Sequence, residues 1–258
     1  MSVEACAALV ERGDPDRFAA TMAAPVALRS RLWPLYAFNL ELAKAAWASA
    51  EPIIAEMRLQ WWRDGLAEVA GGARVRPHDV MGPLALVVRD HDLPVALLEG
   101  MIEAQRWDLG REGFGDAAGL LAHLEATAGS LLVLASRVLE AGEEVEPVVR
   151  RFAFGAGLAN WFLAVPVLVS RGRQPLVDPS EAGIAALAGQ GLAALAEARG
   201  RRGVVPWQAA PALLTGWQAG ALLRQALAEP GRVLAGTMGQ SEFARRGGLA
   251  WRGVTGLW

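Results

Sequence analysis

The sequence predicts a single all-α domain that spans residues 1–258. Ala and Leu dominate the composition and runs of β-branched residues are few, so intrinsic propensity favours helix. Apolar residues recur at helical spacing, and no segment shows the sustained alternation of a half-buried strand. With 53% hydrophobic and 20% charged residues, a chain of this length can bury a sizeable core and is not of the disordered class.

The expected helix boundaries follow from turn and cap signals. Gly13–Asp16 indicates a turn that starts a helix, Gly71–Gly72 ends another, and Asp116 caps a long one. Pro34 is expected to break or adjust the helix in which it lies. The expected helices cover about 16–24, 27–50, 52–70, 83–90, 94–111, 116–140, 152–169, 181–199, 207–228 and 232–246.

Charge and cysteine content narrow the class of protein. The 25 Lys+Arg and 27 Asp+Glu give a net charge of −2, which provides no strong field for nucleic acid. Cys6 is the only cysteine, so an internal disulfide is excluded and a reducing compartment is favoured. The N-terminal segment has neither the features of a secretory signal nor the basic character of a mitochondrial transit peptide. We therefore expect a cytoplasmic protein without a nucleic-acid partner.

The segment 152–169 is an 18-residue run without charge, flanked by arginines, and so reaches the length of a transmembrane candidate. Gly155, Gly157 and Asn160 lower its hydrophobicity, and Pro166 interrupts its far end. No partner span exists elsewhere in the sequence. We therefore interpret it as a buried central helix, and the sequence does not decide whether it contacts lipid.

No common catalytic motif is present. The chain has no dinucleotide-binding glycine motif after a strand, no P-loop and no nucleophile elbow. His78, His91 and His123 are scattered without metal-ligand spacing and are expected to be ordinary surface or helix-face residues. The paired aspartates at helical spacing that hold Mg²⁺ against a diphosphate are also missing from the expected inner helices.

Several segments, in order, resemble the squalene/phytoene synthase family. They are DPDRF at 14–18, AAP at 23–25, LWPLYAFNLELA at 32–43, MRLQWWRDGL at 57–66, HLEATAGSLLVL at 123–134, GLAN at 157–160 and SRGRQPL at 170–176. YAFN and MRLQWWRD are fairly specific together, and the resemblance covers about residues 14–180. It implies an isoprenoid-synthase-like helical bundle around a central cavity.

The acidic positions of that family are lost. Where the first motif of the enzymes continues into paired aspartates, this sequence has Ala43, Lys44 and Trp47. The second motif is similarly replaced, by Leu163, Ala164 and Leu168. The hydroxyl-bearing aromatic residues expected before the Ala-Gly step appear as His123 and Glu125. Ala, Leu and Trp supply no carboxylate to compensate two Mg²⁺ and a diphosphate in an apolar cavity.

The loss resembles a degenerate branch of the family that includes the mitochondrial complex I assembly factor 6 type, a noncatalytic helper at the inner membrane. The resemblance implies a noncatalytic protein that acts as a respiratory complex I assembly factor or binds a lipid or isoprenoid, without cofactor or metal. The alternative is an active head-to-head prenyltransferase with an altered, Mg²⁺-dependent site. Expected partners are a lipid or isoprenoid ligand, a respiratory complex subunit and, by peripheral contact, the inner membrane.

Nine residues are candidates for the cavity or its ligand. They are Tyr36, Asn39, Glu41, Arg58, Trp62, Asp108, Asn160, Arg171 and Arg173. Glu41 is either a ligand-contacting carboxylate or, as we favour, a buried acid paired with an arginine such as Arg58. Trp62, one turn after Arg58, either lines a lipid cavity beside a cation or, as we favour, packs in the core.

The remaining alternatives concern polar groups. Asn160 either binds a ligand or, as we favour, satisfies a polar group of a neighbouring helix. Arg171 and Arg173 either contact a phosphate or an anionic membrane, or are solvated in a loop. The C-terminal segment from Phe243, FARRGGLAWRGVTGLW, mixes Arg with Trp and Leu. It is either an interfacial membrane anchor, a tail that docks to a partner, or a disordered tail.

Overall fold

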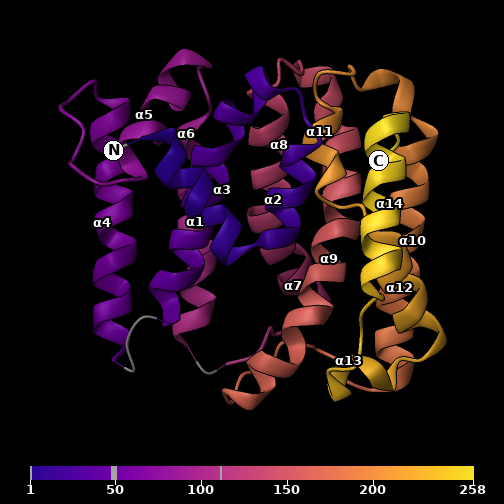
Figure 1. Cartoon of the computed structure of the whole chain (residues 1–258). Coiled ribbons are helices and arrows are strands. Elements are labelled where there is room, and N and C mark those ends of the chain that lie inside the picture. Colours follow the sequence, from indigo (N-terminus) through magenta and orange to yellow (C-terminus); the bar gives the residue numbers. More distant parts are fainter. Residues whose placement is uncertain (1, 48–50, 111) are drawn as a thin grey trace.

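A computed structural model describes residues 2–47, 51–110 and 112–258, with the side chains of residues 46 and 47 outside the description. This part of the chain folds into helices and contains no strand, so the predicted all-α class is confirmed (Figure 1). The longer helices are α1 (Val3–Gly13), α2 (Pro15–Met22), α3 (Val26–Trp47), α4 (Pro52–Ala70), α5 (Met81–Asp90), α6 (Val95–Gln105), α7 (Ala117–Leu124), α8 (Ser130–Arg137), α9 (Glu146–Ser170), α10 (Glu181–Gly200), α12 (Ala219–Ala228) and α14 (Glu242–Thr255). The short ones are η1 (Arg106–Leu109), η2 (Glu125–Gly129), η3 (Glu143–Val145), η4 (Arg202–Val204), α11 (Ala210–Leu214) and α13 (Gly231–Ala235).

Helix ends follow the expected chemistry where a cap signal is strong. Asp14 accepts a hydrogen bond from the Arg17 main-chain N–H at 2.9 Å, and Asp116 does the same for Gly119 at 2.8 Å. Gly71 follows α4 as expected. Pro34 lies inside α3, which continues through it, so the expected break does not occur.

Three expectations about helix boundaries are wrong. The helix expected at 116–140 is interrupted by η2, a π-helical turn of five residues between α7 and α8. The segment 207–228 contains two helices, α11 and α12, and 232–246 is interrupted after α13, where Gly236 takes a φ of 67°. Helix α1 precedes the first expected helix altogether. In the three interrupted helices a local turn overrides propensity, whereas α1 begins at an ordinary cap, where Ser2 accepts a hydrogen bond from the Ala5 main-chain N–H.

Helix α9 packs within the bundle, but it is not buried along its whole length as interpreted from the sequence, since Leu163, Val167 and Val169 are 41%, 52% and 48% exposed. It packs against α8, α10, α12 and η2, and buries Phe152, Leu158, Phe162 and Val165 completely. Contrary to the expectation that no second span exists, Ala117–Arg137 and Glu143–Ser170 are both long and apolar enough to cross a membrane by length and composition, yet 44% and 56% of their apolar windows are buried in the fold. Helices α4 and α14 lie at opposite edges of the bundle in Figure 1.

Candidate functional site

A cavity with a volume of about 540 Å³ lies where α3 and α9 face each other. Asn39 and Ala43 line it from α3 at i and i+4, which places them on one face. Asn160, Ala164 and Leu168 line it from α9 with the same spacing. The two segments that carried the sequence resemblance therefore meet at one cavity, as that resemblance implied. Lys44 lies elsewhere, and the Trp47 side chain is outside the described residues.

Neither asparagine facing the cavity has a hydrogen-bond partner in the described part of the chain. Asn160 is exposed to the open space rather than bonded to a neighbouring helix, so the favoured interpretation of this residue was wrong. Asn39 is half-buried on the opposite wall. Each amide brings two N–H donors and a carbonyl acceptor, so the two walls offer neutral hydrogen-bonding groups.

Three carboxylates also line the cavity, and each lies beside an arginine. Asp14 caps α2 and pairs with Arg17, with 3.2 Å between Oδ2 and Nε. Asp16 pairs with Arg245 of α14 and accepts a hydrogen bond from Gln218 at 2.7 Å. The third carboxylate belongs to η1 and lies beside the turn that follows α9.

This third carboxylate, Asp108, has an unusual environment. Burial raises its pKa to about 6, although Arg173 and Arg171 act in the opposite direction. Arg173 is itself buried: it donates to the Trp107 main-chain oxygen and lies 4.7 Å from the Trp107 ring centre. It therefore belongs neither to a solvated loop nor to a membrane-facing surface. Arg171, on the same turn, is exposed.

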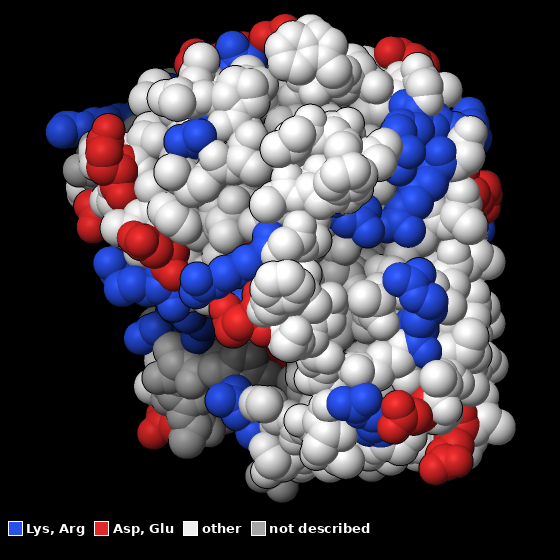
Figure 2. All heavy atoms as spheres, turned by 45° about the vertical axis from the view of Figure 1, so that its right-hand side comes forward, with Lys and Arg blue, Asp and Glu red and all other residues white. Residues whose placement is uncertain are grey.

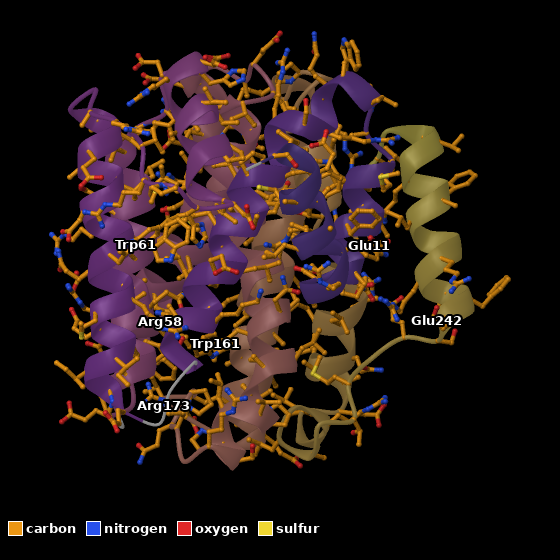
Figure 3. The ribbon with its side chains drawn as sticks, turned by 60° about the vertical axis from the view of Figure 1, so that its left-hand side comes forward. Glu11, Arg58, Trp61, Trp161, Arg173 and Glu242 are labelled. Atoms are coloured by element: carbon orange, nitrogen blue, oxygen red, sulfur yellow. The ribbon has the colours of Figure 1, made fainter. Side chains whose placement is uncertain are left out.

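His123 lies in an aromatic cluster at the same end of the cavity. Its ring is 5.0 Å from that of Trp161, 5.5 Å from Phe114 and 5.7 Å from Trp107. Burial lowers the His123 pKa to about 4, so the ring is neutral at pH 7. Trp161 is fixed by a 2.9 Å hydrogen bond to the Pro175 main-chain oxygen. Figure 3 shows Trp161 and Arg173 near each other at this end of the bundle.

The π-helical turn η2 positions residues beside this cluster. Thr127 and Ala128 of η2 line the cavity, while Glu125 turns away and forms an ion pair with Arg150 of α9. A methyl group on Gly157 of α9 would lie 2.6 Å from Ala128 Cβ, so η2 and α9 pack closely here. Sequence spacing alone did not indicate that His123 enters the cavity whereas Glu125 leaves it.

Three other candidate residues line a separate pocket of about 280 Å³ between α3 and α4. They are Glu41, Arg58 and Trp62. Glu41 is paired with Lys44, with 3.2 Å between Oε1 and Nζ, so the expected Glu41–Arg58 pair does not form. Arg58 is exposed on α4, next to Trp61 in Figure 3. Trp62 is buried with its ring 5.3 Å from Phe38, which agrees with the favoured core-packing interpretation.

Tyr36 lies behind the cavity rather than on its wall. Its ring is fully buried, and the Arg17 guanidinium carbon is 5.2 Å from the ring centre. The hydroxyl has no hydrogen-bond partner within the described chain, and burial keeps its pKa far above the usual range. Tyr36 thus packs against Arg17. Arg17 lines the cavity and lies in the DPDRF segment, but it was not among the residues that the sequence proposed for the site.

The donor set of the cavity does not fit a magnesium pair. Within the residues that the structure describes, no group of three or more His, Cys, Asp or Glu side chains could hold a metal ion. The facing positions on α3 and α9 are Ala43, Ala164 and Leu168, which carry no oxygen ligand in their side chains. Mg²⁺ requires several oxygen ligands around it in near-octahedral geometry.

Comparison with known proteins identifies the family of this chain. The sequence model of squalene/phytoene synthases matches residues 10–177, a range that includes both walls of the cavity. The chain belongs to the squalene/phytoene synthase family. The resemblance inferred from its motifs is thereby confirmed.

Solved structures share the fold of this family member. Squalene synthase HpnC from Alicyclobacillus acidocaldarius superimposes with a TM-score of 0.76 at 18% identity, covering 88% of this chain and 93% of that one. A dehydrosqualene synthase in complex with ligand gives a TM-score of 0.78 at 14% identity, covering 96% of this chain and 94% of that one. At such identities these structures establish the helical isoprenoid synthase fold alone.

The curated relatives that match this chain are named as complex I assembly factors rather than as synthases. NADH dehydrogenase (ubiquinone) complex I, assembly factor 6, from Bos taurus is 28% identical over 138 residues, which is 52% of this chain and 40% of the relative. The Homo sapiens protein of the same name is 26% identical over 138 residues, again 52% of this chain and 40% of the relative. The match thus spans less than half the length of these relatives. It agrees with the predicted likeness to the assembly factor 6 type within the squalene/phytoene synthase family.

Proposed function

We propose that this protein is a noncatalytic squalene/phytoene synthase family member that takes part in respiratory complex I assembly and keeps its cavity for a lipid or isoprenoid. The observation that carries the proposal is the pair of neutral cavity walls. Ala43 on α3 faces Ala164 and Leu168 on α9, at positions where the family resemblance implies acidic residues, and the nearby Asn39 and Asn160 are neutral. Asp14, Asp16 and Asp108 also line the cavity, but each lies beside an arginine, so a diphosphate with two Mg²⁺ would lack free compensating carboxylates.

The chemistry of the cavity supports a ligand with a neutral polar group. Its volume of about 540 Å³ lies within the usual range of small-molecule sites, about 300–1,000 Å³. Leu124, Leu131 and Leu168 supply apolar surface, and the Asn39 and Asn160 amides supply hydrogen bonds. We propose an isoprenoid or lipid chain with an uncharged, hydrogen-bonding head, bound without metal or other cofactor.

The respiratory part of the proposal rests on the names of the curated relatives, which are complex I assembly factors in Bos taurus and Homo sapiens. In this proposal the chain contacts a respiratory complex subunit during assembly. It acts from the cytoplasm, at the periphery of the inner membrane. A nucleic-acid partner is not part of the proposal, since the net charge is −2.

Deletion of the gene in its own host tests this role. We expect less assembled complex I on native gels, with recovery when the wild-type chain is supplied and equal recovery with an Asp108→Asn variant. Normal complex I levels in the deletion strain would contradict the assembly role. Because the readout is assembly, it does not depend on the identity of the cavity ligand.

A second candidate is an active prenyltransferase with an altered site. Asp14, Asp16 and Asp108 line the same cavity, and this observation favours it over other enzyme classes. The purified protein is incubated with Mg²⁺ and farnesyl or geranylgeranyl diphosphate, and products are analysed by mass spectrometry. The noncatalytic proposal expects no coupled product.

Matched variants make the turnover assay decisive. Mg²⁺-dependent product formation that is lost in Asp16→Asn or Asp108→Asn, and kept in Glu41→Gln, would establish the alternative and overturn the noncatalytic proposal. Glu41→Gln is the control because Glu41 lines the neighbouring pocket and not the cavity.

A further inference from the structure

Helix α14 presents an apolar face to solvent. Phe243, Trp251 and Val254 are 89%, 66% and 88% exposed. Their spacing of i, i+8 and i+11 places them on one side of the helix. The opposite side packs on the bundle through Leu249, which contacts a small buried cluster, and through Arg245, which pairs with Asp16. The helix is thus held by one leucine and an ion pair while large apolar side chains point outward, so most of its apolar surface faces away from the core.

The apolar surface continues beyond α14. Trp207 is 71% exposed and lines a pocket of about 410 Å³ together with Leu257 and residues 252–253 of α14. Contiguous exposed apolar patches rimmed by polar residues mark interaction surfaces. Trp in particular favours the boundary between apolar and aqueous phases, because its ring is apolar and its indole N–H is polar.

Four arginines gather beside this apolar surface. They are Arg199, Arg202, Arg224 and Arg252. Arg199 and Arg202 donate to the Trp258 main-chain oxygen at 3.0 and 3.1 Å. Their Nη2 and Nε atoms, respectively, are buried without an acceptor within the described chain. Figure 2 shows basic side chains gathered beside a broad uncharged surface on this side of the molecule.

Within the residues that the structure describes, no Asp or Glu side chain forms an ion pair with these four arginines. Burial and the charges of Arg252, Arg202 and Arg224 lower the Arg199 pKa to about 10. The Arg252 pKa is lowered in the same way by burial and by Arg202 and Arg224. Glutamates nearby in sequence bind other arginines: Glu197 pairs with Arg151, and Glu229 with Arg232.

We propose that α14 and the arginine cluster (Arg199, Arg202, Arg224 and Arg252) form a docking face for anionic phospholipid. Phe243, Trp251 and Val254 enter the interfacial region of the bilayer. The solvent-accessible N–H groups of the arginines bind lipid phosphates. Exposed aromatic rings beside four clustered arginines complement a negatively charged bilayer surface, which is why we commit to lipid as the occupant.

This inference rests on the membrane part of the proposed function and specifies its surface and its lipid class. It does not depend on the cavity, because none of the four arginines lines it. Failure in a lipid assay therefore leaves the turnover and complex I tests untouched, and failure in those tests leaves the docking face untouched.

Vesicle co-sedimentation of the full chain tests the face. The probes are phosphatidylcholine vesicles and phosphatidylcholine vesicles with about one third phosphatidylglycerol. We expect binding to the anionic vesicles only, weakening as salt rises from about 50 to 500 mM, because salt screens the charge attraction. Absence of binding to anionic vesicles, or equal binding to neutral ones, would overturn the inference.

Two double variants test the two halves of the face. Arg224→Gln with Arg252→Gln is expected to weaken binding by roughly tenfold or more, since each basic group near an anionic surface contributes about fivefold. Phe243→Ala with Trp251→Ala is expected to weaken it by a similar factor through lost apolar burial. Thermal unfolding of each variant is measured in parallel to verify that it folds.

Each double variant has a matched control elsewhere on the surface. Arg12→Gln with Arg74→Gln removes the same charge from exposed positions in α1 and in the loop after α4. Met57→Ala with Leu86→Ala removes exposed apolar groups that are 66% and 60% accessible. The controls are expected to bind like wild type. Equal losses in controls and face variants would show nonspecific adsorption and overturn the docking face.

Discussion

Arg173 donates a hydrogen bond to the Trp107 main-chain oxygen, and this contact holds its guanidinium beside the Asp108 carboxyl group at one end of the cavity. The attraction between the two groups is smaller than the cost of burying the acid, because the Asp108 pKa is raised to about 6 rather than lowered. The ionised carboxylate therefore destabilises the fold at neutral pH.

Replacing Asp108 by Asn is expected to stabilise the protein at pH 7. A rise of the pKa from 3.8 to about 6 corresponds to a cost of about 1–3 kcal/mol for the charged form. A raised acid pKa means that this cost is full above pH 6 and is relieved as the pH falls towards 4. The difference in unfolding free energy between Asp108→Asn and wild type should thus close over that range in urea titrations. A difference that widens on acidification would contradict this environment for Asp108.

His123 is expected to act in the opposite direction on acidification. Its pKa is lowered from 6.5 to about 4 by burial, so below pH 6.5 the unfolded chain binds a proton that the folded chain does not. The wild type should lose up to about 3 kcal/mol of stability from this group as the pH falls to 4. In His123→Phe an aromatic ring still packs against Trp107 and Trp161, but it has no ionisable group. The pH-dependent loss of unfolding free energy should therefore vanish from denaturation curves. An unchanged pH profile would show that His123 is solvated.

Simple helix spacing explains which candidate residues meet at the cavity. Asn39 and Ala43 are four residues apart and share a face, and Asn160 and Ala164 repeat this on α9. Glu41 is two residues after Asn39, so the two point about 200° apart on the same helix. Spacing alone could therefore have separated Glu41 from the cavity residues.

Other features depended on tertiary structure. Strong caps such as Asp14 and Asp116 fixed helix starts that the sequence predicted well. The π-helical turn at Glu125–Gly129 changes the phase of its helix without a Gly-Pro signal, so the direction of His123 could not be read from spacing. The role of Arg173 depends on the main-chain oxygen of Trp107, which no sequence pattern reveals.

Restoring one acid to the second motif is expected to destabilise the protein. Leu168 is 7% exposed and lines the cavity, so Leu168→Asp exchanges apolar contacts for a poorly solvated carboxylate and should cost about 3 kcal/mol or more. Val169→Asp, next to it and 48% exposed, is the control and should cost less than about 1 kcal/mol. Adding Mg²⁺ should not restore the melting temperature of Leu168→Asp. Restoration would reveal an oxygen donor set that the described residues do not provide.

A last prediction tests the packing that fixes α9, and with it one wall of the cavity. A methyl group on Gly155 would lie 2.8 Å from the Gly191 main-chain oxygen and 2.6 Å from Leu195 Cγ, so α9 and α10 approach too closely for a side chain there. Gly155→Ala should cost about 1–3 kcal/mol through overpacking. Gly189 lies in α10 with no atom within 4 Å of such a methyl group, and Gly189→Ala should add up to about 1 kcal/mol through helix propensity. Chemical denaturation of the two variants compares the same substitution in both settings, and a stabilising Gly155→Ala would refute the close contact between α9 and α10.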